Sequence, residues 1–193
     1  MRFRHSPCIR SIAAFLALAF CLSALPVSAA KRAKPKADKP PRYRAALLIE
    51  AGTGQVLIED QADRKLIPAS LVKMMTLYLI FESLEDGRLT LDAELKVSKR
   101  AAGQTPSRLG LKQGSSITVE DAIHAVVTKS ANDAATVLAE ALGETEVQFA
   151  LRMTKRARTL GMVRTRFTNA TGLPNRRQRT TARDMATLAL ALF

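Results

Sequence analysis

Residues 68–87 read PASLVKMMTLYLIFESLEDG, and this stretch decides the fold. It predicts a helix that starts after the proline and stops at Gly87. Apolar residues occur on nearly every side of this helix, which is typical of a helix central to its domain. Lys73 is the only charged residue between Ser70 and Phe81. We therefore expect a central helix that carries one lysine among apolar neighbours.

Ser70 and Lys73 are spaced as a nucleophile and its base would be. Residues three apart share one face of a helix, so the Lys73 amine can reach the Ser70 hydroxyl, and burial would lower the pKa of the amine. A neutral amine would activate the serine for acyl-enzyme chemistry. The alternative is that Ser70 caps the helix while Lys73 extends to water. The same SxxK spacing occurs at Ser28–Lys31, so the spacing alone does not decide.

The first 30 residues have the pattern of a secretory signal peptide, with a basic start, an apolar core at 12–25 and a small-residue exit. The core is too short to favour a membrane span. Both cysteines, Cys8 and Cys21, lie within it, so the mature chain would have no disulfide. Only His124 remains after cleavage, which argues against a zinc site or a histidine triad. We expect an exported protein with no metal.

Residues 31–44, KRAKPKADKPPRYR, form a basic linker that contains proline. Much of the net charge of +13 lies in this linker and in the signal peptide, which argues against a nucleic-acid-binding face. The linker would be a solvated tether, or a segment attracted peripherally to anionic membrane or wall polymers. Residues 45–193 would form one partial domain.

The rest of the domain divides into short elements. A β-hairpin is predicted at 45–50 and 55–61 around the turn AGTG. Residues 88–118 are rich in turn formers, with short extended pieces at 95–98 and 116–118. Thr118 and Asp121 resemble a capping box. Helices are predicted at 119–128, 133–142, 146–160 and from 181 onward, with FTNATGLPNRRQ as a loop.

Ser130 and Asn132 form the only SxN in the chain, between two predicted helices. A turn at this place would project both side chains toward Ser70. A second hydroxyl would then pass a proton to the departing amine, and the amide would hold the peptide substrate. Alternatively, one of the two residues only caps the next helix.

Five segments, in this order, resemble the low-molecular-mass penicillin-binding proteins of the D-alanyl-D-alanine carboxypeptidase type. They are PASLVKMMT, LGLKQGSSITVEDAI, KSANDAATVLAEAL, LGMVRTRFTNATGLPN and TTARDMATLAL. The resemblance covers nearly all of 45–193. It implies an α/β (α+β) transpeptidase fold like that of penicillin-binding proteins and β-lactamases, with a helical cluster and an antiparallel sheet. It also implies a bacterial envelope or periplasmic enzyme of peptidoglycan synthesis and cell shape.

The resemblance implies a role for each site residue. Ser70 attacks the carbonyl between two D-alanines of a peptidoglycan stem peptide, and its backbone N–H helps to form the oxyanion hole. Lys73 is the base, Ser130 relays a proton to the leaving D-alanine, and Asn132 orients the peptide. Water then hydrolyses the acyl-enzyme. β-Lactams would acylate the same serine, and the reaction needs no cofactor.

The third family motif, Lys-Thr-Gly, does not occur in these 193 residues. Lys155 is the last lysine, and neither Thr53-Gly54 nor Thr171-Gly172 follows a basic residue. We therefore expect a C-terminally truncated chain of low activity, whose hairpin lacks the late strands of the sheet and keeps unpaired edges. Losing one oxyanion donor alone typically slows a reaction ~10²- to 10³-fold.

Three other functions are alternatives to the carboxypeptidase hypothesis. A D,D-endopeptidase acting on cross-links would use the same residues. A wall-binding remnant without catalysis is a second alternative. A class A β-lactamase is disfavoured, because it needs a deacylating glutamate after SxN and no glutamate follows Glu146.

Overall fold

The computed structural model describes residues 43–193. The predicted signal peptide and all but the last two residues of the predicted linker lie outside this range. The elements, in chain order, are β1 (Ala46–Ile49), β2 (Val56–Asp60), the short 3₁₀ turn η1 (Ala69–Leu71), α2 (Val72–Glu85), β3 (Glu94–Lys96), α3 (Lys99–Ala102), β4 (Ser116–Thr118), α4 (Val119–Lys129), α5 (Asn132–Gly143), α6 (Glu146–Thr159) and α7 (Ala182–Leu192).

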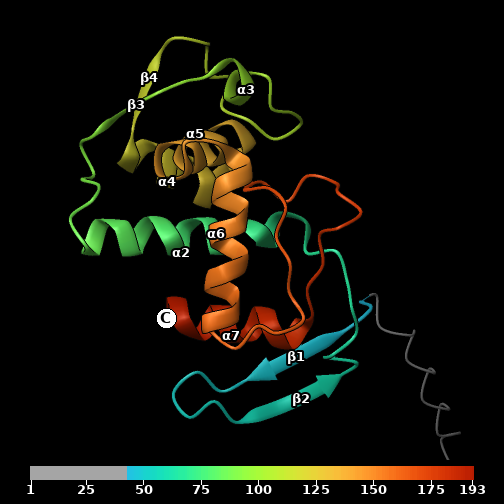
Figure 1. Ribbon diagram of the computed structural model, residues 1–193. Coiled ribbons are helices and arrows are strands. Elements are labelled where there is room, and N and C mark those ends of the chain that lie inside the picture. Colours follow the sequence, from blue (N-terminus) through green and yellow to red (C-terminus); the bar gives the residue numbers. More distant parts are fainter. Residues whose placement is uncertain (1–42) are drawn as a thin grey trace, which may run out of the picture. The chain divides into compact units, whose positions relative to one another are not determined.

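Helix α2 lies at the centre of the described domain, as the sequence predicts. It packs against α5, α6 and α7, with α4 and α5 on one side and α7 on the other (Figure 1). Val72, Met75 and Ile80 have no exposed surface. Gly87 follows the helix with a φ of 69°, a conformation that glycine adopts without steric penalty.

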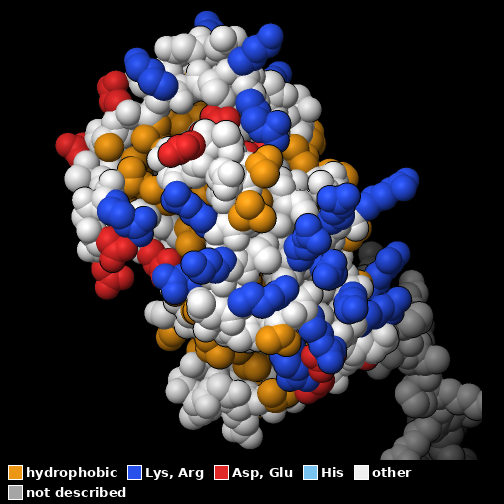
Figure 2. Space-filling view, viewed as in Figure 1, with side chains coloured by type: hydrophobic (Ala, Val, Ile, Leu, Met, Phe, Trp, Pro, Cys, Tyr) orange, Lys and Arg blue, Asp and Glu red, His pale blue; other side chains and the backbone are white. Residues whose placement is uncertain are grey.

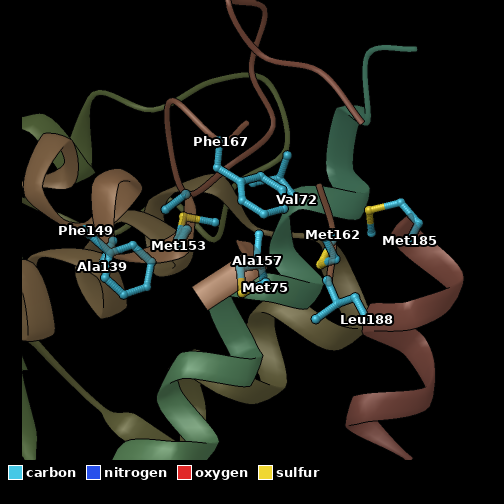
Figure 3. Packing of buried hydrophobic residues seen from close by; sticks show 11 residues of the cluster. Val72, Met75, Ala139, Phe149, Met153, Ala157, Met162, Phe167, Met185 and Leu188 are labelled. Carbon is cyan, nitrogen blue, oxygen red and sulfur yellow. The ribbon is translucent and has the colours of Figure 1, made fainter. Parts of the chain in front are cut away.

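The main core joins four helices, α2, α5, α6 and α7, and the segment between α6 and α7. Figure 3 shows Met75 of α2 among Met153 and Ala157 of α6 and Leu188 of α7, with Phe167 of the intervening loop close to Val72. Burial of each large apolar side chain stabilises the fold by about 1.5–3 kcal/mol. This packing fixes α2 against the segment that follows α6, and that contact builds the site described below.

Strands β1 and β2 form the predicted hairpin, with Leu48 opposite Ile58. The Glu50 carboxylate closes the turn by accepting hydrogen bonds from the backbone N–H of Gly52 and of Thr53. Among residues 43–193 these two strands pair only with each other, and Leu48 and Ile58 are each about half exposed (49% and 53%). The expected unpaired edges are therefore present.

A second two-stranded sheet joins β3 and β4 antiparallel, which confirms extended pieces near the predicted places. The Thr118 hydroxyl caps α4 by accepting from the backbone N–H of Asp121 at 3.1 Å, as predicted. Helix α3 was not predicted. Its N-cap is Ser98, which accepts from the backbone N–H of Ala101. One four-residue turn is too short to produce a helical period in the sequence.

The segment between α6 and α7 is anchored by a buried polar cluster. The hydroxyls of Thr165 and Thr180 lie 2.8 Å apart, and Thr165 donates to the Asp184 carboxylate at 2.6 Å. Backbone bridges join Thr180 to Leu66 and Arg166 to Arg179. This irregular segment is therefore held in one conformation although it has no regular secondary structure.

No helix within 43–193 is both long and apolar enough to cross a membrane. In the same range, no three His, Cys, Asp or Glu side chains are grouped as metal ligands would be.

Candidate active site

Ser70 lies in the η1 turn, directly before α2, and is exposed. The helix N-cap is Leu71, and no side chain caps α2 or η1. The capping alternative for Ser70 is therefore wrong. The turn begins with Ala69 at a φ of 48°, a strained value for a residue with a side chain. The strained backbone turn presents the Ser70 hydroxyl at the end of the central helix.

Lys73 is buried one turn later, with 4% of its surface exposed. Its Nζ atom donates a hydrogen bond to the carbonyl oxygen of Thr171 at 2.6 Å. Burial lowers the pKa of Lys73 to about 8, in the direction predicted from the sequence. The alternative in which Lys73 extends to water is wrong. Among the described residues, no hydrogen bond joins Lys73 to Ser70.

The loop that holds Lys73 makes a second contact with α2. The Thr76 hydroxyl donates to the carbonyl of Ala170 at 2.8 Å, so two successive carbonyls of this loop accept from the first turns of the helix. The loop is rigid at this point, because the Asn169 side chain accepts from the backbone N–H of Gly172 and donates to the carbonyl of Leu173.

Gly172 presses directly against the backbone of the turn that holds Ser70. It has a φ of 85°, and a Cβ atom placed on it would lie 1.9 Å from the carbonyl oxygen of Ala69 and 3.0 Å from the backbone N of Ser70. Only glycine fits here. The sequence places this glycine in a loop, but the contact with Ser70 joins positions far apart in the chain, so no local pattern reveals it.

Glu146 is a buried carboxylate that supports the same loop. Its Oε1 atom accepts from the backbone N–H of Ala170 at 3.1 Å, and its Oε2 atom is paired with Arg100 of α3. One carboxylate thus joins α3, the start of α6 and the loop that holds Lys73. No local sequence pattern marks either side chain as part of a site.

Ser130 and Asn132 occupy the turn between α4 and α5. Ser130 ends α4 in the left-handed conformation, with a φ of 54°, and Asn132 is the first residue of α5. Neither side chain caps α5, whose N-cap is Ala131, so the capping alternative is wrong here too. Asn132 is 4% exposed, and its backbone N–H donates to the carbonyl of Ser107 at 2.7 Å.

Asp133, which the sequence analysis did not select, fixes this turn. Its buried carboxylate accepts from the backbone N–H groups of Leu109, Gly110 and Leu111 at 2.9–3.1 Å. Burial alone would raise the pKa of Asp133, but these hydrogen bonds outweigh burial and hold the pKa below its usual value. The 107–111 loop is thereby tied to the start of α5.

The predicted site residues thus lie in two groups. Ser70 and Lys73 belong to the start of α2 and contact the 170–172 loop, while Ser130 and Asn132 belong to the turn before α5. Helices α2 and α5 pack against each other. No hydrogen bond within the described part of the chain joins one group to the other.

Comparisons with known proteins agree on one family. The sequence model of the peptidase S11 family, which is described as D-alanyl-D-alanine carboxypeptidase, matches residues 32–193. D-alanyl-D-alanine carboxypeptidase DacF of Bacillus subtilis is 35% identical over 150 residues, which cover 78% of this chain and 39% of DacF.

Solved structures share the fold. DacD from Francisella tularensis superposes with a TM-score of 0.77 and 34% identity, over 82% of this chain and 38% of that one. Penicillin-binding protein D2 from Listeria monocytogenes, in its ampicillin-bound form, gives a TM-score of 0.69 and 31% identity, over 77% of this chain and 60% of that one. The chain spans less than half the length of DacF and of the Francisella enzyme. It belongs to the D-alanyl-D-alanine carboxypeptidase family of serine peptidases.

Proposed function

We propose that this chain carries the nucleophile and base of a D-alanyl-D-alanine carboxypeptidase that removes the terminal D-alanine from peptidoglycan stem peptides. The observation that carries the proposal is the exposed Ser70 hydroxyl one turn before a buried Lys73 whose pKa is about 8. An amine with this pKa is neutral in roughly a quarter of molecules at pH 7.5. An ordinary exposed lysine is almost fully charged at that pH.

The proposed reaction begins with transfer of the Ser70 hydroxyl proton to the neutral Lys73 amine. The serine oxygen bonds to the carbonyl carbon between the two D-alanines, and the backbone N–H of Ser70 stabilises the oxyanion. The C–N bond then breaks, and Ser130 donates its hydroxyl proton to the departing D-alanine while it takes up the proton held by Lys73. Asn132 orients the peptide, and water hydrolyses the ester.

The 170–172 loop would hold the base in place during this sequence. Thr171 accepts one N–H of Lys73, which fixes the direction of the Nζ atom. Gly172 lies against the backbone of Ser70, and so limits movement of the turn that carries the nucleophile.

β-Lactams are proposed inhibitors, because the Listeria relative was solved with ampicillin bound. A D,D-endopeptidase is the second candidate. An Escherichia coli D-alanyl-D-alanine endopeptidase is 31% identical over 98% of this chain. Release of D-alanine from a monomeric pentapeptide, compared with cleavage of a cross-linked dimer, would separate the two activities.

Export and envelope localisation are also proposals, supported by the signal-like residues 1–30. We further propose that the basic residues 31–44 act as a tether between the folded domain and the anionic envelope. N-terminal sequencing of the secreted protein would test the predicted cleavage after Ala29 or Ala30.

The test of catalysis is covalent labelling by a fluorescent penicillin, with the modified residue identified by mass spectrometry. We expect a slow adduct on Ser70, because no Lys-Thr-Gly occurs within residues 1–193. Ser70→Ala should abolish the adduct, and Lys73→Ala should slow its formation further. An adduct of equal yield in Ser70→Ala, or the absence of any adduct after prolonged incubation, would contradict the proposal.

A further inference from the structure

A groove of about 590 Å³ lies between α6 and the segment that follows it. The charged side chains that line it are all arginines, namely Arg158, Arg166, Arg177 and Arg179, and all four are exposed. We call it the arginine groove. Its apolar wall includes Leu151, which is 60% exposed. Figure 2 shows Lys and Arg side chains gathered over this region of the surface. Its volume is in the range of known ligand sites.

Two of these arginines are held directly opposite each other. The backbone N–H of Arg166 donates to the carbonyl of Arg179 at 2.8 Å, and the reverse bond measures 3.1 Å. Residues paired in this way project their side chains to the same face, and like charges there are destabilising. The neighbouring Thr165 and Thr180 contact each other on the buried face. The backbone therefore directs the side chains of Arg166 and Arg179 to the same, open face.

The groove arginines are among the arginines of residues 43–193 that form no ion pair with an acidic side chain. Outside the groove, ion pairs join Arg100 to Glu146, Arg156 to Glu82, Arg164 to Asp63 and Arg183 to Asp63. Within residues 43–193, none of the four groove arginines is paired with a carboxylate. A guanidinium group binds a planar oxyanion through two parallel hydrogen bonds. Arg158 already donates to the backbone carbonyl of Met162, so the groove presents Arg166, Arg177 and Arg179 as donors to an external anion.

The arginine groove continues toward the nucleophile. Arg179 also lines a second hollow of about 400 Å³ together with Arg44 and Lys65, and this hollow reaches Ile67, three residues before Ser70. On the other side, Thr168 of the groove lies two residues before Ala170, whose carbonyl binds α2. Arg179 therefore lines both hollows, and the second hollow extends to Ile67.

We propose that the arginine groove binds the carboxylates of a peptidoglycan peptide strand, at a place separate from the residues that cleave it. The identity of this ligand rests on the proposed function. A concave groove with an apolar wall fits an acidic peptide chain better than it fits the flat surface of a membrane. Carboxylates repeated along the peptide would offset the charge of the opposed arginines.

The test is cosedimentation of the Ser70→Ala chain with insoluble peptidoglycan from which attached phosphate polymers have been removed. The Arg166→Gln/Arg179→Gln variant should bind about tenfold more weakly, because two charge-assisted contacts are lost. Lys99→Gln/Lys112→Gln removes the same charge from exposed positions outside the groove and should change binding less than twofold. Peptidoglycan with amidated carboxylates should bind the parent chain as weakly as it binds the arginine variant.

Three results would overturn the inference: equal binding by the two double variants, equal binding to amidated peptidoglycan, or arginine-dependent binding only to phosphatidylglycerol vesicles. Urea unfolding must show that the arginine variant folds. If it does not, Arg158→Gln/Arg177→Gln replaces it and must weaken binding in the same way. Penicillin labelling of Ser70 is measured separately in chains that keep the serine. If penicillin labels Ser70 but the groove arginines do not affect peptidoglycan binding, only the groove inference is refuted. If the arginines affect binding but penicillin does not label Ser70, only the catalytic proposal is refuted.

Discussion

The amine of Lys73 donates to the carbonyl of Thr171 at 2.6 Å, across 98 positions of sequence. This hydrogen bond joins the central helix to an irregular loop. It satisfies the donor of a buried lysine without adding a negative charge, so the pKa of Lys73 stays low. A carboxylate partner in the same place would raise that pKa and weaken the base.

Stability should therefore depend on pH through Lys73. Its pKa falls from 10.5 to about 8 on folding, so the unfolded chain binds more protons between these pH values. The free energy of unfolding, relative to Lys73→Met, should rise by up to about 3 kcal/mol from pH 8 to 10.5. Below pH 8 the buried amine is charged, so the cost of burying that charge lowers the free energy of unfolding by its full amount.

Urea unfolding of both chains at several pH values measures this difference. Lys112→Met removes an exposed lysine and provides the control, which should show no such rise. A difference between wild type and Lys73→Met that does not change from pH 7 to 10 would mean that the buried amine does not titrate differently on folding.

Gly172→Ala should lower stability and disturb Ser70, the proposed nucleophile. Gly161 provides a matched control, since both glycines have a φ of 85° but nothing lies within 4 Å of a Cβ on Gly161. Gly161→Ala should cost about 1 kcal/mol, from backbone strain alone. Gly172→Ala must also displace the backbone of Ala69 and Ser70, and should cost about 3 kcal/mol or more. Equal losses, with equal rates of penicillin labelling, would show that the contact with Ser70 has no effect.

Asp133→Asn should loosen the SxN turn. The variant replaces a buried carboxylate that accepts four backbone hydrogen bonds, and we expect a loss of about 2–3 kcal/mol in urea unfolding. Because the folded pKa of Asp133 is lowered, its contribution is present above pH 3.8 and is lost as the pH falls through the folded value. The free energy of unfolding of Asp133→Asn should therefore lack the contribution that the wild-type chain loses in acid. Glu120→Gln, at an exposed position, should change stability by a few tenths of a kcal/mol.

Substitutions of Glu146 should have graded effects. Glu146→Gln keeps an oxygen that accepts from the backbone N–H of Ala170 but loses the charge opposite Arg100, and should cost about 1–2 kcal/mol. Glu146→Ala also leaves that buried N–H without a partner and should cost about 3 kcal/mol or more. Urea unfolding measures both. Equal losses would show that the hydrogen bond to the Lys73 loop contributes nothing.

Much of the fold is predictable because its signals are local. Helix α2 is specified by one apolar run, its end by Gly87, and the start of α4 by the Thr118 cap. The hairpin follows from two apolar runs around a glycine turn. Each of these features depends on residues that lie close together in the chain, and a sequence pattern records such residues directly.

The site is only partly predictable. The SxxK spacing and the apolar neighbours of Lys73 correctly predict that its pKa is lowered. They also predict that its amine reaches Ser70, whereas the amine donates to the carbonyl of Thr171. The roles of Asp133, Glu146 and Gly172 were not predicted, because each acts on backbone groups of a distant or irregular segment. A buried carboxylate has no periodic signal that separates it from an exposed one.

The sequence by itself determined the central helix, the candidate nucleophile and base, and the family resemblance, because these depend on residue type and short spacing. Only the tertiary structure decided what holds the base, why residue 172 is glycine, and that Arg166 and Arg179 face the same side. These relationships arise when the 160–181 segment packs against α2 and pairs with itself. That packing is a property of the whole core and of no single stretch of the chain.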